Sequence, residues 1–115
     1  MAVTLKLIEE AETHVMLALK GSLDMDGAWE IERDLMGHLS EAMRHLLIDM
    51  SAVDLLGSMG IRVFVRSASA LARNQKKLVL FATRPFVDRA LAVTGFKSAV
   101  PVVRTMKDAK AAIGV

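Results

Sequence analysis

The sequence predicts an α/β fold: a single mixed, mainly parallel sheet with an N-terminal antiparallel hairpin and about four helices. Three observations support this class. Apolar, strand-like segments alternate along the chain with segments whose apolar residues recur every three or four positions. The first two strand-like segments are separated only by a short polar stretch, which is typical of a hairpin. After them strands and helices alternate one for one, which favours parallel strands joined by right-handed crossovers.

The hairpin is predicted from a change in how its two strands are patterned. A half-exposed strand is predicted over Val3–Glu9, because Val3, Leu5 and Leu7 alternate with Thr4 and Lys6, and a mostly polar stretch follows to Glu12. The next segment, His14–Leu19, is mostly apolar, as an interior strand would be.

A helical stripe then follows, and Asp24 and Asp26 precede it where acidic groups favour a helix start. The stripe consists of Ala28, Ile31, Leu35, Leu39 and Ala42.

The middle of the chain predicts two buried strands on either side of a second helix. The strands are Leu46–Met50 and Leu78–Ala82, and the apolar stripe of the helix runs from Ile61 to Ala72. Between the first strand and the helix lies a loop that contains Gly57-Ser58-Met59-Gly60.

The C-terminal part predicts two more helices and a last strand. Pro85 suits the first turn of a helix, and Gly95 suits its end because glycine adopts the left-handed conformation without strain. A strand is predicted over Ala99–Val103, and Pro101 places it at a sheet edge because proline cannot donate a ladder hydrogen bond. We expect Val3–Glu9 to form the other edge. Thr105 and Asp108 resemble a capping box that opens a last helix through Ile113.

Length and composition limit the function classes. The 115 residues, 53% hydrophobic and 24% charged, fit one compact domain over 1–115. No uncharged apolar stretch approaches the ~20 residues of a membrane helix, and the first residues lack a signal-peptide pattern, so we expect a cytoplasmic protein without membrane insertion. The absence of cysteine excludes disulfides and thiolate zinc sites. A net charge of +2 is too small to favour direct nucleic-acid binding, and Arg62, Arg66 and Arg73 are interpreted as a solvated helix face.

Ser58 has two interpretations that the local sequence leaves open. Gly57 could take a positive φ and turn the chain into the helix, with Ser58 as the N-cap that accepts from the Ile61 amide. Alternatively, Ser58 is a modification site, since a phosphate there would meet free amides and the positive end of the helix dipole.

Catalytic and ligand-binding motifs lack their partners. A P-loop needs a lysine after its second glycine, a dinucleotide fingerprint needs three glycines, and the G-x-S-x-G elbow is absent. The histidines form no H-E-x-x-H site: His45 adjoins a strand start, and His14 and His38 are expected on solvated faces. We therefore expect no enzyme activity, no metal and no cofactor.

Three collinear segments resemble the STAS domain family, named for sulphate transporters and anti-sigma factor antagonists. "LKGSLDMDGAWEIERDL" resembles the family's strand that ends in G-x-L-D and leads into the first helix. "LLIDMSAVDLLGSMGIRVFV" resembles its central signature of strand, loop, D-S-S-G and apolar helix. "FATRPFVDRALAVTGFKSAVPVVRTMKDAKAAI" resembles its closing pattern of helix, T/S-G-hydrophobic, strand and short helix.

The resemblance implies a regulatory binding protein. Ser58 falls where stand-alone members are phosphorylated by an anti-sigma factor that is also a serine kinase; the unphosphorylated protein binds this kinase, and phosphorylation abolishes binding. Asp24 and Asp49 match acidic positions near the same rim, and Gly60 matches a signature glycine that leaves room for a partner's backbone. Gly57 replaces the usual aspartate, which removes a kinase contact, and Met59 replaces a hydroxyl residue and favours an apolar partner surface. The partner-binding set predicted in this way is Asp24, Asp49, Gly57, Met59, Gly60 and Arg62.

Other functions and one further contact remain open. The chain could be an unphosphorylated adaptor subunit of a transport or signalling complex, with Ser58 only a cap, or a STAS domain that binds a small ligand or nucleotide. Met25 and Trp29 lie beside the apolar stripe of the first helix. We expect both to be partly exposed and to join the partner contact, the alternative being that they fill the core.

Overall fold

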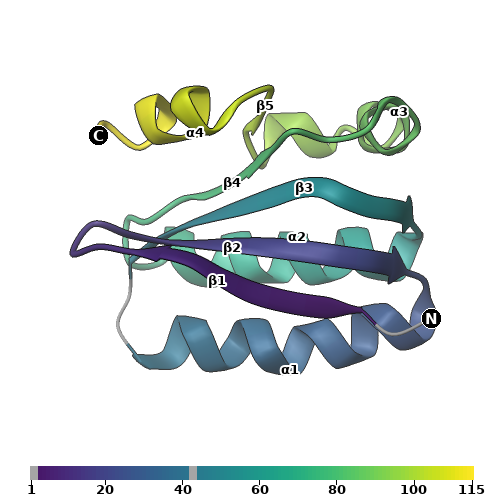
Figure 1. The fold of residues 1–115 in the computed structure, drawn as a ribbon, viewed down its shortest axis with the longest axis horizontal. Helices are drawn as coiled ribbons and strands as arrows, with labels where there is room; N and C mark the ends of the chain where they lie inside the picture. Colours follow the sequence, from purple (N-terminus) through teal and green to yellow (C-terminus); the bar gives the residue numbers. More distant parts are fainter. Residues whose placement is uncertain (1–2, 42–43) are drawn as a thin grey trace.

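The computed structural model describes residues 3–41 and 44–115. Ala42 and the side chain of Leu39, both part of the predicted helical stripe, lie outside what it describes. The described strands form one five-stranded sheet in the order β1-β2-β3-β4-β5, in which β1 pairs antiparallel with β2 and the other pairs are parallel. The strands are β1 (Thr4–Glu10), β2 (His14–Leu23), β3 (His45–Leu56), β4 (Leu78–Phe81) and β5 (Val102–Val103). The predicted hairpin, the parallel core and both edge strands are confirmed (Figure 1).

The helices of the described residues cover both faces of this sheet, three on one face and one on the other. They are α1 (Met25–Glu41), α2 (Ser58–Ala72), α3 (Pro85–Val93) and α4 (Met106–Ala112), with a short 3-10 helix η1 (Phe96–Ser98) after α3. The larger core packs α1, α2 and α3 against the sheet, and the smaller core packs Ala109 of α4 against Met16, Leu47 and Val79. The predicted fold class is therefore confirmed.

The two cores follow from the alternation of side chains along the central strands. In β2, Val15 and Leu17 belong to the larger core, whereas Met16 between them belongs to the smaller one. In β3, Leu47 likewise faces away from its neighbours Leu46 and Ile48. Strands that are buried on both faces need apolar residues at every position, which explains the uninterrupted apolar segments in the sequence.

The predicted helix ends are confirmed where local chemistry determines them. Pro85 lies in the first turn of α3, and Gly95 has a φ of +71° just after that helix. Thr105 caps α4, because its hydroxyl accepts a hydrogen bond from the Asp108 amide at 3.0 Å. Asp24 does the same for α1, and its Oδ1 accepts from the Gly27 amide at 2.8 Å.

The last strand is shorter than predicted, since only Val102–Val103 of Ala99–Val103 pairs with β4. The amides of Ala99 and Val100 donate instead to the Phe96 carbonyl and close the 3-10 turn. The Pro101 carbonyl accepts from the Leu80 amide at 3.0 Å, so this proline contributes its acceptor to the edge.

The third strand is longer than predicted, and the expected loop after Met50 is strand. β3 continues to Leu56 alongside β2, and the register shifts twice along this stretch. Such shifts are β-bulges, which place extra residues in one strand without ending the pairing. The sequence did not predict that β3 continues beyond Met50, because polar Ser51 and Asp54 interrupt the apolar pattern.

His14 lies in the interior, contrary to the expected solvated face. It is 3% exposed, and its Nε2 lies 2.5 Å from Glu9 Oε2. Glu9 also contacts Lys110 Nζ at 3.2 Å, which ties α4 to the hairpin. Hydrogen bonds from His14, which has the larger effect, and from Lys110 lower the pKa of Glu9. This hydrogen bond supplies a partner for a histidine side chain that the alternation of β2 buries on the same face as α4.

Candidate partner-binding surface

The β2–α1 and β3–α2 turns lie side by side at one end of the sheet. Leu23 and Leu56, the last residues of β2 and β3, are partners in the parallel ladder. The Gly57 amide then donates to the Leu23 carbonyl at 2.9 Å and joins the two turns. Because the strands end together, α1 and α2 also begin at the same end (Figure 1). Residues far apart in the sequence, such as Asp24 and Ser58, therefore belong to one surface.

Ser58 is the exposed first residue of α2 and does not cap this helix. The N-cap is Gly57, whose carbonyl accepts from the Ile61 amide at 3.1 Å, and no side chain bonds to the helix start. Gly57 has φ −93° and ψ 177°, an ordinary extended conformation. Both the predicted Ser58 cap and the predicted positive φ are therefore wrong: β3 runs straight to Leu56, and no left-handed turn is needed before the helix.

The hydroxyl of Ser58 is consequently outside the helix's own hydrogen bonds. The amides of Ser58, Met59 and Gly60 precede the first helical bond and have no acceptor within α2. The first turn of α2 carries no acidic residue. A negative group on Ser58 would therefore be next to the positive end of the helix dipole, without a carboxylate on that turn to repel it.

Gly60 faces the protein interior, so the expectation that it leaves room for a partner is wrong. A Cβ on Gly60 would lie 2.9 Å from Leu23 Cβ and 2.8 Å from Leu56 Cδ1. The glycine thus allows α2 to approach the ends of β2 and β3. Its role is to set the position of the helix that carries Ser58.

The two predicted acidic positions separate in the structure. Asp24 is exposed at the start of α1, close to the Ser58 turn. Asp49 lies in the middle of β3, pairs with Ala18, and accepts a hydrogen bond from the Ser51 amide at 2.9 Å. Ala18 and Leu23 are five residues apart along β2, or ~17 Å in an extended strand. The expectation that Asp49 shares the rim with Ser58 is therefore wrong.

The other predicted contact residues surround Ser58 on α2. Met59 is partly buried and packs against the larger core. Arg62 lies one turn after Ser58 and is exposed, and within residues 3–41 and 44–115 it forms no ion pair or hydrogen bond with a side chain. A cation close to Ser58 is thus available to a partner or to an anion on the serine.

Large apolar side chains are exposed on the neighbouring helix, as predicted for Met25 and Trp29. Their exposed fractions are 71% and 65%, and the Arg33 guanidinium lies 5.9 Å from the centre of the Trp29 ring. Leu55, next to the end of β3, is 44% exposed. Sequence reasoning missed Leu55 because the strand was expected to end before it. Exposed apolar groups of this size are characteristic of binding surfaces.

In the part of the chain that the structure describes, no three His, Cys, Asp or Glu side chains come together as metal ligands. No helix among these residues is long and apolar enough to span a membrane. What the surface offers is an exposed hydroxyl at a helix start, apolar side chains beside it, and charged residues of both signs.

Comparison with known proteins shows the family. The profile of the STAS domain matches residues 6–109, and the chain belongs to this family. BtrV of Bordetella bronchiseptica, named as a candidate anti-sigma factor antagonist, is 27% identical over 105 residues, which are 91% of this chain and 90% of BtrV.

Solved structures of the same fold agree with this assignment. An anti-sigma factor antagonist from Mycobacterium paratuberculosis superposes with a TM-score of 0.83 at 25% identity, covering 96% of this chain and 93% of that one. Unphosphorylated SpoIIAA, an anti-sigma factor antagonist, gives 0.80 at 15% identity with 97% and 98% coverage. Phosphorylated SpoIIAA of Bacillus gives 0.70 at 14% identity with 96% and 99% coverage. The chain thus has the anti-sigma factor antagonist-like form of the STAS fold.

Proposed function

We propose that this chain is a non-catalytic regulatory protein that binds a serine-kinase anti-sigma factor and is released when Ser58 is phosphorylated. The exposed Ser58 at the start of α2 is the observation that carries this proposal. Similarity to proteins named as anti-sigma factor antagonists supports the choice of partner, and a relative of the same fold has been solved in both unphosphorylated and phosphorylated forms. The domain would act in the cytoplasm, where sigma factors and their regulators work.

The proposed partner surface combines the exposed residues of both turns. It comprises Ser58, Asp24 and Arg62, with Met59 and Gly57 shaping the turn between them. Trp29 and Met25 would supply the apolar area, since a large aromatic side chain contributes strongly to binding when a partner covers it. Arg62 and Asp24 would fix the orientation of the partner through charge.

Phosphorylation would abolish binding without unfolding the domain. A phosphate on Ser58 is tolerated in the free protein because it faces water, α2 amides and the helix dipole. A docked protein would have to remove water from this charge. This desolvation costs about 2 kcal/mol or more unless the partner supplies cations. The serine hydroxyl is small and neutral, and a partner can cover it at little cost by offering one hydrogen bond.

The test measures the affinity of wild type, Ser58→Ala and Ser58→Asp for a purified serine-kinase anti-sigma factor from the same organism. Isothermal titration at equal foldedness is suitable, and incubation of wild type with this kinase and ATP followed by mass spectrometry identifies the modified residue. We expect Ser58→Ala to bind like wild type, and Ser58→Asp to bind at least ~10-fold more weakly, which corresponds to about 1.4 kcal/mol.

Ser69→Asp is the matched control, because Ser69 is an exposed serine on the same helix, away from the turn. It adds the same charge and should leave the affinity unchanged. Equal binding by Ser58→Asp and wild type would refute the switch. Absence of binding by wild type and Ser58→Ala would refute the proposed partner.

A further inference from the structure

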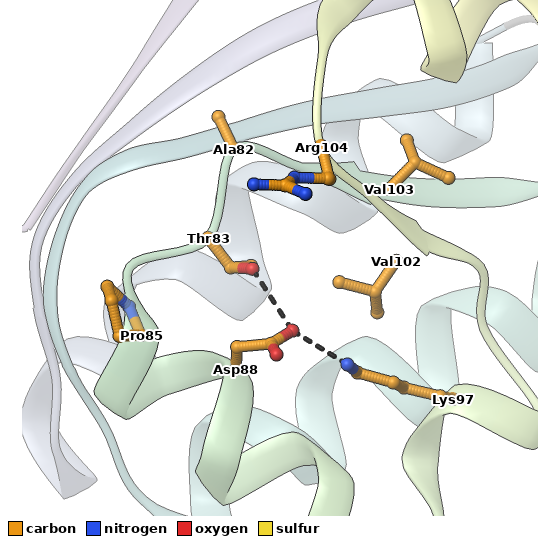
Figure 2. A pocket seen from close by; sticks show the side chains of 8 residues that line it. All are labelled: Ala82, Thr83, Pro85, Asp88, Lys97, Val102, Val103 and Arg104. Atoms are coloured by element: carbon orange, nitrogen blue, oxygen red, sulfur yellow. Dashed lines mark hydrogen bonds and ion pairs between the residues drawn. The ribbon is translucent and has the colours of Figure 1, made fainter.

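A second candidate site lies at the carboxyl ends of β4 and β5, on residues that the proposed partner surface does not use. There the structure has a hollow of about 620 Å³ between the end of β4, the start of α3, η1 and the end of β5 (Figure 2). Its size is within the ~300–1,000 Å³ range of small-molecule sites. The lining residues are Ala82, Thr83, Pro85, Asp88, Lys97, Val102, Val103 and Arg104. The carboxyl ends of parallel strands are also where open α/β sheets usually bind ligands.

The polar groups of this hollow are mostly donors. Asp88 Oδ1 lies 2.7 Å from Lys97 Nζ and accepts from the Thr83 hydroxyl at 3.4 Å, so this carboxylate already has two partners (Figure 2). Arg104 forms no hydrogen bond or ion pair with any described residue. Its five N–H donors, two further donors of Lys97 and the lone pairs of Thr83 remain available. With Lys97 neutralised by Asp88, the lining carries about one excess positive charge.

The walls between these groups are apolar. Val102 projects into the hollow between Lys97 and Arg104, and the Arg104 guanidinium lies on the side of Ala82 and Thr83 (Figure 2). Pro85 and Val103 complete the lining. Such a combination suits a molecule with one anionic end and a compact apolar part.

The backbone at the edge of the hollow is in an unfavourable conformation. Ala82 has a φ of +60°, in the left-handed region that residues with a Cβ rarely adopt, while its amide donates to the Val103 carbonyl at 3.1 Å. The Arg84 side chain holds the same turn, since its Nε donates to the Ser51 carbonyl at 2.9 Å. Conformations of this kind occur preferentially at ligand sites, where the surrounding structure maintains them. Here the turn places Thr83 on the hollow.

We propose that the hollow bounded by Thr83, Lys97, Val102 and Arg104 binds a small organic oxyanion, a phosphate monoester or a carboxylate. Arg104 binds the anionic group through paired N–H donors, the geometry that guanidinium offers to both kinds of oxyanion. Lys97 completes the donor set, and the Thr83 hydroxyl, which donates to Asp88, forms part of the wall. Val102 and Pro85 contact the apolar part of the ligand.

A hollow on the exposed face of α1 has the opposite charge balance. It is lined by Trp29, Glu30, Arg33 and Asp34, so two carboxylates face one guanidinium that already stacks on the Trp29 ring. This lining would repel an anion. The positive balance at Arg104 thus distinguishes the hollow at β4 and β5 from the one on α1.

The test is a titration of ¹⁵N-labelled wild-type protein with phenyl phosphate, benzoate and inorganic phosphate, followed by amide NMR shifts. We expect saturable shifts confined to residues 82–88, 97 and 102–104, with a Kd on the order of 1 mM or below for one of the two aromatic anions. The tighter of the two identifies the ligand as phosphate or carboxylate. Inorganic phosphate should bind more weakly than phenyl phosphate, since it lacks an apolar part.

Arg104→Gln should lose binding by at least ~10-fold while its remaining spectrum stays that of wild type. Lys107→Gln removes the same charge from an exposed residue outside the lining and should bind within about twofold of wild type. The proposal is overturned if neither aromatic anion gives saturating amide shifts at a concentration 20-fold above ~1 mM. It is also overturned if Arg104→Gln binds the anion like wild type. These outcomes are independent of the anti-sigma factor, because Ser58 and its partner do not enter the titration.

Discussion

Gly27 is the residue whose replacement should most directly disturb the turn that presents the partner surface. An alanine Cβ at Gly27 would lie 2.1 Å from the Ser22 carbonyl oxygen, far below the 3.0 Å under which real contacts essentially never fall. The Ser22 oxygen is a backbone atom and Cβ is attached rigidly to the backbone of α1, so no flexible side chain can move away. Gly27→Ala must therefore displace α1 from the end of β2, and it also disturbs the hydrogen bond from the Gly27 amide to Asp24.

The expected loss of stability follows from two opposing contributions. Overpacking of this kind costs ~1–3 kcal/mol, and a clash between Cβ and a backbone carbonyl belongs at the upper end. The change from glycine to alanine in a helix returns about 0.5–1 kcal/mol. The net loss should be roughly 2 kcal/mol, which lowers the Tm of a domain of this size by roughly 8 °C.

Urea unfolding followed by circular dichroism measures this difference, with a lower midpoint and an unchanged m-value expected for Gly27→Ala. Gly37→Ala is the matched control in the same helix. A Cβ there meets no described atom within 4 Å, so this variant should gain about 0.5–1 kcal/mol. A Gly27→Ala protein as stable as wild type would refute the close packing of α1 on β2 described above.

Three further predictions concern caps, pH and the single tryptophan. Ser58→Ala should change the unfolding free energy by less than about 0.5 kcal/mol, because Ser58 makes no cap bond. Thr105→Ala should cost ~1 kcal/mol, because the Thr105 hydroxyl caps α4. Chemical denaturation compares the two variants, and equal losses of stability would contradict the assigned caps. Burial, and then nearby Lys and His charges, lower the pKa of His45 below its ordinary value of 6.5, and its Nδ1 accepts from the Lys77 amide. The free energy of unfolding should therefore fall as pH decreases through 6.5 towards the folded-state pKa. His45→Asn keeps an acceptor and should remove this pH dependence, and a variant with the same pH profile of stability as wild type would contradict the assignment. Trp29→Ala should leave the unfolding free energy within about 0.5 kcal/mol of wild type but weaken kinase binding. Iodide should quench the fluorescence of Trp29, the single tryptophan, strongly in the free protein and weakly in the complex. Equal quenching in both would exclude Trp29 from the interface.

Local patterns were sufficient for much of the fold. Element type and order were predicted from the alternation in the Val3–Glu9 segment, the apolar run of His14–Leu19 and the stripes of α1 and α2, because burial on one or two faces imposes a distinct period on each kind of element. Pro101 identified an edge strand, since a missing amide is tolerated only there. Thr105 identified a helix start because the cap bond forms within four residues of sequence.

The candidate site was predictable only in part. The sequence indicated that Ser58 lies near the start of α2, and Met25 and Trp29 could be placed outside the apolar stripe of α1. It did not show which residue caps α2 or which acidic residue is close to Ser58. Both depend on where β3 ends, and the continuation of a strand through polar residues depends on pairing with β2.

Only the tertiary structure decided these points, because they arise from contacts between segments far apart in the sequence. Pairing of Leu23 with Leu56 moves the end of β3 to the same place as the end of β2, and it separates Asp49 from the surface that carries Ser58. The register also sets Gly60 against Leu23, which gives this glycine a packing role. The hollow at Arg104 joins side chains from α3, η1, β5 and the segments that follow β4 and β5, and no local period in the sequence records such a meeting. Sequence by itself determined the elements, their order and the family, whereas strand register determined which side chains share a surface.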